Sequence, residues 1–148
     1  MIAEQPPAGS AYELAWINDY VGVPYRHNGR DRAGWDCWGL VLAVYRDMLG
    51  LELPDWRWAE PFSLSARVAV FGNAWAKVRE SGMALELAAP EPLAIALVLF
   101  PDRMRPHHVG VVAGAGVLHA RDYGGTVYEP LRRFVETYPG VTWWRWHR

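Results

Sequence analysis

The chain has 148 residues, of which 51% are hydrophobic and 21% are charged, and its formal net charge is −1. This length and composition predict a single globular domain over residues 1–148 and exclude a disordered chain. The nearly balanced charge gives no electrostatic reason to expect a nucleic acid or an anionic membrane as a partner, and no apolar run reaches the roughly 20 residues that a membrane helix needs.

Three helices are predicted in the first half of the chain, because apolar residues recur at helical spacing over residues 10–20, 37–49 and 63–80. Ser10 and Asp36 are placed to cap the first two helices, and Gly50 is placed to end the second. The intervening residues 23–35 are rich in polar residues, show no periodicity and are predicted to form a loop.

The second half is predicted to form a sheet, with strands over residues 93–100, 108–113, 117–121, 126–130 and 141–146. The first of these is a continuous apolar run between two prolines, as expected of a buried strand. Gly114, Ala115 and Gly116 join the next two strands and predict a hairpin. Helices followed by strands predict an α+β fold, in which N-terminal helices pack on one side of a C-terminal antiparallel sheet.

Cys37 is the only cysteine, which excludes an internal disulfide. It follows the expected cap of the second helix, where unpaired amide groups and the helix dipole favour a thiolate. A small buried thiol without reactivity is the other interpretation of such a lone cysteine. Position alone does not decide between a nucleophile and a packing residue.

Two histidines favour the nucleophile. His108 begins one strand of the predicted hairpin and His119 lies near the end of the other, so their rings can approach each other across neighbouring strands. One imidazole would assist a thiolate while the second orients the first. A zinc site formed by Cys37, His108 and His119 is the less favoured alternative, because metal ligands usually include a closely spaced pair.

Four sequence motifs resemble those of the NlpC-type cysteine peptidases, which are papain-like cell-wall endopeptidases of bacteria and phages. The motifs are Gly22-Val23-Pro24-Tyr25, Gly34-Trp35-Asp36-Cys37-Trp38-Gly39-Leu40-Val41, His108-Val109-Gly110-Val111 and Leu118-His119-Ala120. They occur in the family's order and cover most of the chain. The resemblance implies a papain-like NlpC-type fold and hydrolysis of peptidoglycan stem peptides, commonly next to γ-D-glutamyl-diaminopimelate.

The same resemblance implies roles for individual residues. Cys37 is expected to be the nucleophile, with its backbone amide helping to stabilise the oxyanion. His108 is expected to be the general base and acid, and His119 the residue that orients His108. The residues expected to line the substrate site are Tyr25, Asp36 and Trp38. No cofactor and no metal is implied.

Two departures from the family pattern bear on the setting. Trp38 stands where many members have serine, and this form resembles a phage tail-associated branch, which implies phage tail proteins as partners. The run from Ala94 to Val98 replaces the Gly-Asp with which many members open that strand. The alternatives are a tail-assembly protein that uses the fold for binding, and an amidase or acyltransferase acting on another substrate. The first residues lack the features of a signal peptide, so we expect synthesis in the cytoplasm and, in the tail setting, incorporation into a virion.

Several other residues carry weaker signals. His107 is expected to be an exposed or loop residue, because neighbouring strand residues face opposite sides, and His27 is expected on the surface. Arg26, Arg30 and Arg32 are expected in a solvated loop, and the alternative is that they contact the carboxylates of an acidic stem peptide. A docking surface is the alternative to packing for Trp143, Trp144 and Trp146.

Overall fold

The computed structural model describes residues 11–57, 64–102 and 105–146. The helices are α1 (Ala11–Asn18), α2 (Cys37–Leu49), α3 (Leu64–Ser81) and α4 (Leu131–Thr137). The strands are β1 (Arg30–Asp31), β2 (Gly34–Trp35), β3 (Ala84–Leu87), β4 (Ile95–Leu99), β5 (Pro106–Ala113), β6 (Gly116–Arg121), β7 (Gly125–Pro130) and β8 (Val141–Trp146). Within these three ranges, no helix combines the length and the apolar character needed to cross a membrane.

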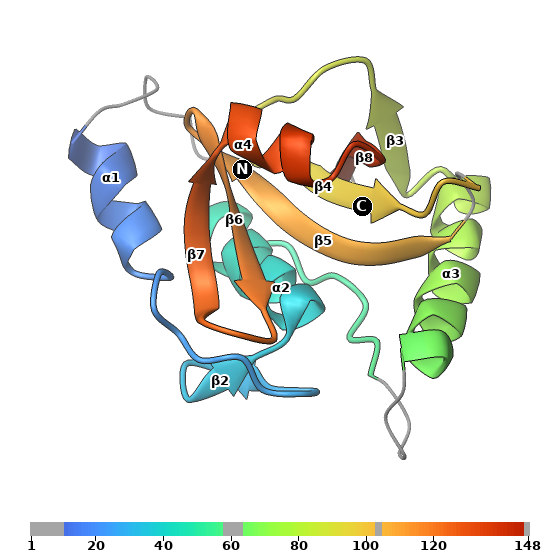
Figure 1. Cartoon of the computed structure of the whole chain (residues 1–148), viewed down its shortest axis with the longest axis horizontal. Coiled ribbons are helices and arrows are strands. Elements are labelled where there is room, and N and C mark those ends of the chain that lie inside the picture. The colour runs from blue at the N-terminus through green and yellow to red at the C-terminus, as the bar shows by residue number, and fades with distance from the viewer. Residues whose placement is uncertain (1–10, 58–63, 103–104, 147–148) are drawn as a thin grey trace.

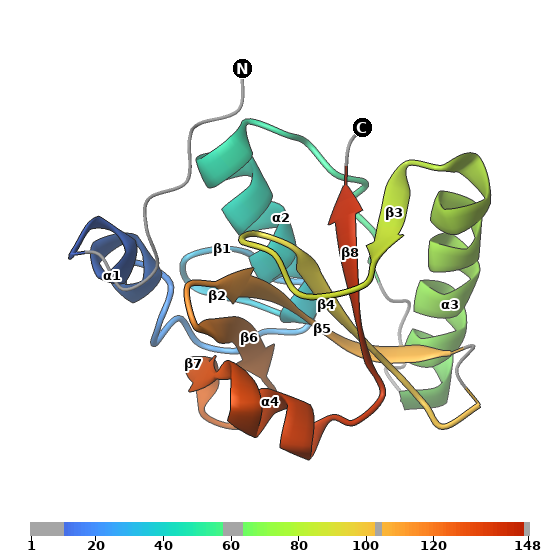
Figure 2. The same ribbon diagram turned by 90° about the horizontal axis from the view of Figure 1, so that it is seen from above.

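Six strands form one antiparallel sheet in the order β3-β8-β4-β5-β6-β7, and β1 and β2 form a separate short ribbon. Helix α2 lies on one face of the sheet and α4 on the other, while α3 stands beside the β3 edge (Figures 1 and 2). The predicted α+β fold with helices packed on an antiparallel sheet is confirmed. The prediction placed helices on one side of the sheet only, and it is incomplete because α4 covers the second face.

The central strand β4 shows why a continuous apolar run was required. Ile95 and Leu97 belong to the larger core cluster, which also contains the buried face of α2. Ala96 and Val98 belong to a smaller cluster with Phe134 of α4. Because successive side chains of a strand point to opposite faces, a strand covered by helices on both sides must be apolar at every position.

Helix α2 begins and ends where the sequence predicts. The Asp36 side chain accepts a hydrogen bond from the amide of Gly39, and Gly50 ends the helix in the left-handed conformation with φ of 65°. The first predicted helix corresponds to the shorter α1, and its expected cap, Ser10, lies outside the described residues.

The sequence prediction lacks the strand β3, the helix α4 and the short strands β1 and β2, which lie within the predicted loop 23–35. β3 pairs only with β8 at the edge of the sheet, and its Leu85 and Glu86 are exposed, so it lacks the alternation of a half-buried strand. α4 has seven residues and buries only Phe134. A single buried residue makes no apolar stripe that a sequence pattern can reveal.

An aromatic cluster joins α2 to α3 and β8. Trp75 of α3 contacts Trp38 of α2 at a centroid distance of 6.4 Å and Trp144 of β8 at 5.4 Å, both edge to face. Trp144 and Trp146 are buried, whereas Trp143 is half-buried. Trp144 and Trp146 therefore have a packing role. Through Trp75, this packing connects α2, the helix that carries Cys37, to β8 near the β3 edge of the sheet.

Candidate active site

A cavity of about 150 Å³ contains the predicted nucleophile and the predicted general base. It is lined by Tyr25, Cys37, His107, His108, Ala120, Arg121, Asp122, Tyr123 and Tyr138. Cys37 is the first residue of α2 and is 4% exposed, so this cavity is where an otherwise buried thiol meets the surface.

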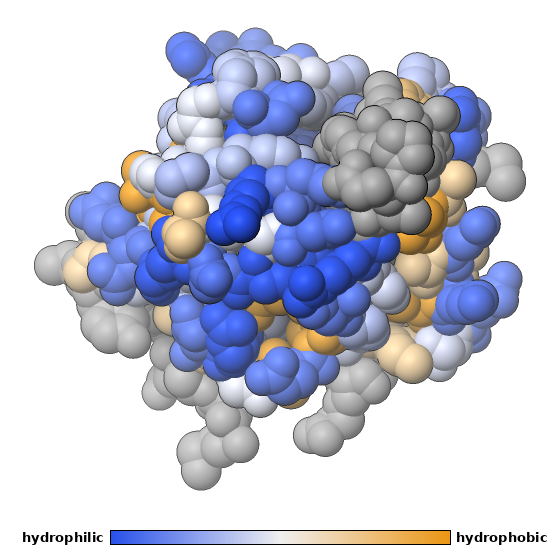
Figure 3. Space-filling view, turned by 90° about the horizontal axis from the view of Figure 1, so that it is seen from below, coloured by the Kyte–Doolittle hydropathy of each residue, from blue (hydrophilic) through white to orange (hydrophobic). Residues whose placement is uncertain are grey.

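The loop before α2 and the turn between β6 and β7 lie on the lower face of the molecule in Figure 1. That face is largely hydrophilic, with small apolar areas between polar side chains (Figure 3). Such a surface suits a polar ligand rather than a lipid or an apolar partner.

His108, His119 and Glu129 form a continuous chain of hydrogen bonds, which we call the histidine relay. Nε2 of His108 lies 2.8 Å from Nδ1 of His119, and Nε2 of His119 lies 2.6 Å from a carboxylate oxygen of Glu129. Because a carboxylate only accepts hydrogen bonds, Nε2 of His119 donates, and its Nδ1 accepts from Nε2 of His108. With its proton on Nε2, a neutral His108 accepts a further proton at Nδ1.

His119 is held in its neutral form. Its side chain is fully buried, and burial lowers the pKa of its imidazole below the ordinary value. The Glu129 carboxylate opposes this shift, and the positive charge of Arg121 adds to it. A neutral ring carries one proton at neutral pH, which agrees with its donating to Glu129 while accepting from His108.

Glu129 is missing from the sequence prediction. In the antiparallel pair of β6 and β7, His119 lies opposite Val127 and Glu129 lies opposite Val117. Residues at such diagonal positions share a face of the sheet and come within reach of each other. A histidine and a glutamate are common partners, so the residue types of His119 and Glu129 are compatible with a hydrogen bond. The register of β6 and β7, which brings the two side chains together, cannot be read from the sequence.

His107 also lines the cavity, and its predicted exposed or loop position is wrong. His108 pairs with Val98, but Pro106 pairs with Leu99, so His107 is an extra residue in β5. A bulge of this kind interrupts the alternation of side chains between the two faces. The half-buried imidazole stacks on the ring of Phe100 at a centroid distance of 4.4 Å.

Tyr138, at the end of α4, is a further cavity residue that the sequence did not suggest. Its ring centroid lies 5.3 Å from that of His108 and 5.9 Å from that of His119. Burial is the main reason that the pKa of its hydroxyl is raised, so the ring is uncharged at neutral pH. Tyr138 therefore packs against both imidazoles of the relay and restricts their movement.

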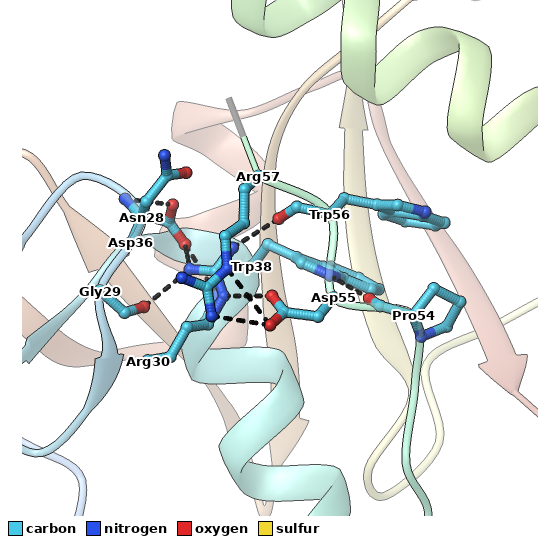
Figure 4. Close-up of polar contacts among 10 residues, drawn as sticks. Asn28, Gly29, Arg30, Asp36, Trp38, Pro54, Asp55, Trp56 and Arg57 are labelled. Carbon is cyan, nitrogen blue, oxygen red and sulfur yellow. Dashed lines mark hydrogen bonds and ion pairs between the residues drawn. The ribbon is translucent and has the colours of Figure 1, made fainter. Parts of the chain in front are cut away.

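Asp36 does not line the cavity, contrary to the prediction. One oxygen of its fully buried carboxylate accepts hydrogen bonds from the amide of Gly39 at 2.8 Å and from Nη1 of Arg30 at 2.9 Å, and the other accepts from the amide of Asn28 at 3.1 Å (Figure 4). Arg30 also binds Asp55 at 2.6 Å. A carboxylate with no exposed surface cannot reach a substrate, and this one instead ties two loops to the start of α2.

Trp38 is likewise buried rather than exposed to the cavity, so its predicted contact with substrate is not supported. Its Nε1 donates to the carbonyl of Pro54 at 2.8 Å, and its ring stacks on that of Trp56 at 4.6 Å (Figure 4). Consecutive helix residues are turned by about 100° from each other. The residue after Cys37 therefore points into the aromatic cluster and not into the site.

The arginines of the loop are engaged elsewhere. Arg30 forms ion pairs with Asp36 and Asp55, and Arg32 forms one with Asp47. Neither they nor Arg26 line the cavity. Contact of these three side chains with a ligand bound there is not supported.

The alternative of a zinc site finds no support in the geometry. Among the residues that the structure describes, no three side chains of His, Cys, Asp or Glu are grouped as metal ligands. Both ring nitrogens of His119 are occupied, one by His108 and the other by Glu129.

Comparison with known proteins identifies relatives of the chain. The model of the NlpC/P60 family matches residues 22–142. The probable endopeptidase NlpC of Escherichia coli (strain K12) is 42% identical over 45 residues, which are 28% of this chain and 29% of that protein. The chain thus matches less than a third of the length of this curated relative.

Solved structures share the fold. The NlpC/P60 domain of the peptidoglycan hydrolase SagA superposes with a TM-score of 0.53 at 19% identity, over 84% of this chain and 91% of that one. An NlpC/P60 family protein from Bacillus cereus ATCC 10987 superposes with a TM-score of 0.57 at 18% identity, over 91% of this chain and 40% of that one. At such identities these structures show the fold alone. The family model covers most of the chain, however, and this protein belongs to the NlpC/P60 family of papain-like cysteine peptidases.

Proposed function

We propose that this protein is an endopeptidase that hydrolyses amide bonds in peptidoglycan stem peptides, with Cys37 as its nucleophile. The observation that carries the proposal is one cavity shared by Cys37, at the N-terminus of α2, and His108, the first ring of the histidine relay. Family membership supports it, as do the names of two relatives, a peptidoglycan hydrolase and a probable endopeptidase.

The reaction would proceed through a thioester. Nδ1 of His108 takes the proton of the Cys37 thiol, and the helix N-terminus stabilises the thiolate. The sulfur attacks the carbonyl carbon, and the backbone amide of Cys37 helps to stabilise the resulting oxyanion. His108 returns the proton to the leaving nitrogen as the C–N bond breaks. Water then gives a proton to His108 and attacks the thioester, and the C–S bond breaks. The sulfur takes the proton back from His108, and the released carboxylic acid ionises to a carboxylate.

The cleaved bond is a finer part of the proposal. We place it next to γ-D-glutamyl-diaminopimelate, as the sequence motifs of the family imply. A test is to incubate the purified protein with cell walls that contain this linkage and to identify the released fragments by mass spectrometry. The expected result is a set of fragments that begin or end at γ-D-glutamyl-diaminopimelate, together with loss of turbidity.

The matching control for that test is Cys37→Ser. Intact wall peptides after treatment with the wild-type protein, together with a thiol that alkylates only above its ordinary pKa of about 8.5, would contradict the hydrolase. Cleavage at a different amide would support the assignment as a cysteine hydrolase but would show that the cleaved bond is wrongly assigned.

A phage tail setting is the second finer proposal, and it rests on the Asp36-Cys37-Trp38-Gly39 motif. In this setting the chain is made in the cytoplasm and acts at the tail tip, with tail proteins as partners. Trp38 is buried, so it would contribute packing rather than a docking contact. Association with isolated tails without wall cleavage would favour the alternative, a tail-assembly protein.

Glu129→Gln is expected to lower kcat by at least about tenfold. An amide offers both a donor and an acceptor, so it no longer fixes the tautomer of His119 and, through it, that of His108. The measurement is kcat on the wall peptide beside the thermal midpoint of unfolding. Glu136→Gln, an exposed change on α4, is the matched control, and a kcat of Glu129→Gln equal to that of this control would contradict the role.

A further inference from the structure

Arg121 is a cavity residue that the mechanism above does not use. It is the last residue of β6, and its side chain lines the cavity together with Cys37 and His108. The residue lies two positions after His119, on the side of the site where β6 turns into β7. The basic residues that line the cavity are Arg121, His107 and His108.

The guanidinium of Arg121 lacks the partners that buried arginines normally have. Its Nε is buried without a hydrogen-bond partner. Asp122 also lines the cavity, yet no ion pair joins it to Arg121 in the described part of the chain. Arg30, by contrast, has two carboxylate partners. A buried donor is rarely left unpaired in a folded protein. The Nη groups of Arg121 are not among the buried atoms, and no hydrogen bond or ion pair engages them in the described part of the chain, so they are the donors open to a ligand in the cavity.

The turn after β6 holds the guanidinium in place. Its central carbon lies 4.8 Å above the ring centre of Tyr123, within the range of a cation–π contact. A side chain at Gly124 would bring a Cβ to 3.1 Å from Nη2 of Arg121, so glycine leaves room for this arrangement. The positive charge also reaches the relay, where it helps to lower the pKa of His119 after the larger effect of burial.

We propose that Arg121 is a specificity residue that binds a carboxylate of the substrate close to the scissile amide. A guanidinium presents N–H groups in a fork that matches the two oxygens of a carboxylate. The carboxylate of an acidic peptide would accept hydrogen bonds from the Nη groups of this guanidinium. The substrate class in this inference rests on the proposed function. The residue that recognises an acidic group is then Arg121 at the end of β6, and not one of the loop arginines.

Two alkylating reagents test the anion subsite without any hydrolysis. Iodoacetate and iodoacetamide each form an S–C bond to the thiolate with loss of iodide, but only iodoacetate carries a carboxylate. Because Cys37 is the only cysteine, the ratio of the two rate constants reports on this cavity and cancels changes in thiol ionisation. We expect Arg121→Met to lower the iodoacetate-to-iodoacetamide ratio at least about tenfold.

Two further variants sharpen the test. Arg121→Lys should lower the ratio less, because lysine keeps the charge and loses the fork. Arg132→Met, an exposed change on α4 outside the cavity, should leave it unchanged. An unchanged ratio in Arg121→Met, or an equal fall in Arg132→Met, would overturn the proposal. Failure of both reagents to modify the folded protein would also overturn it, since the cavity would then admit no anion to Cys37.

Matched peptides separate this proposal from the proposed function. The pair carries either a free carboxylate or a carboxamide beside the same scissile bond. The wild type should favour the carboxylate peptide in kcat/KM, and Arg121→Met should lose that preference. Cleavage of both peptides with no preference would refute the specificity role while supporting the hydrolase. Cleavage of neither, with the alkylation ratio as expected, would refute the hydrolase and support an anion site beside a reactive thiol.

Discussion

Cys37→Ala is expected to lower the turnover of wall peptides by at least about 10⁴-fold. The proposed reaction needs a covalent bond to sulfur, and the chain contains no second cysteine that could replace it. Alanine is small and favours helices, so a change at the first residue of α2 should leave the fold intact. Initial rates on the peptide, measured beside the thermal midpoint of unfolding, test both statements.

Histidine variants extend this test to the relay. His108→Ala should lose nearly as much activity as Cys37→Ala, because His108 moves the proton in both halves of the reaction. His119→Ala should lose less, because it acts on the thiol only through His108. Activity of Cys37→Ala above one tenth of the wild type would show that the nucleophile is wrongly assigned. Equal losses in both histidine variants would contradict the division of roles.

Arg30→Met is expected to lower the free energy of unfolding by about 3–5 kcal/mol. The change removes the cation that faces Asp36, whose carboxylate has no exposed surface. A buried charge that loses its partner is strongly destabilising, because neither water nor another charge compensates it. Urea unfolding followed by tryptophan fluorescence measures the effect, and the start of α2 should be the region most affected.

Two variants make this prediction specific. Arg30→Met combined with Asp36→Asn should recover most of the lost stability, because it removes the buried charge while asparagine still caps the helix. Arg57→Met removes the other arginine bound to Asp55, at an exposed pair, and should cost little. A loss in Arg30→Met no larger than that in Arg57→Met, or no recovery in the double variant, would refute a structural ion pair.

Local patterns predicted much of the fold correctly. The apolar periodicity, the aspartate cap and the terminal glycine defined α2 to the residue. Residues 93–100 and the glycine-rich hairpin identified the centre of the sheet. Each of these signals depends on residues close in the sequence, whose preferences are not overridden by distant contacts. Cys37 and His108 could be paired in the same way, because their elements were correctly placed.

The remaining site residues depend on features that periodicity does not carry. One extra residue in β5 brings both His107 and His108 to the cavity. The register of β6 and β7 brings Glu129 beneath His119. Arg121 differs from the other described arginines in lining the cavity and in having a buried, unpaired Nε, and both are properties of the folded molecule. Proximity to Cys37 in the sequence was a poor guide, since Asp36 and Trp38 both point into the protein.

The histidine relay and the nucleophile reach the site by different routes. All three members of the relay come from residues 108–129, within two successive hairpins, and each hydrogen bond spans about ten positions. Cys37 comes from far earlier in the sequence and joins them only when α2 packs on β5 and β6. Closing such a long loop is slower than forming hairpins. The nascent polypeptide therefore carries a thiol without its catalytic partner, and its reactivity toward amide bonds is withheld until folding is complete.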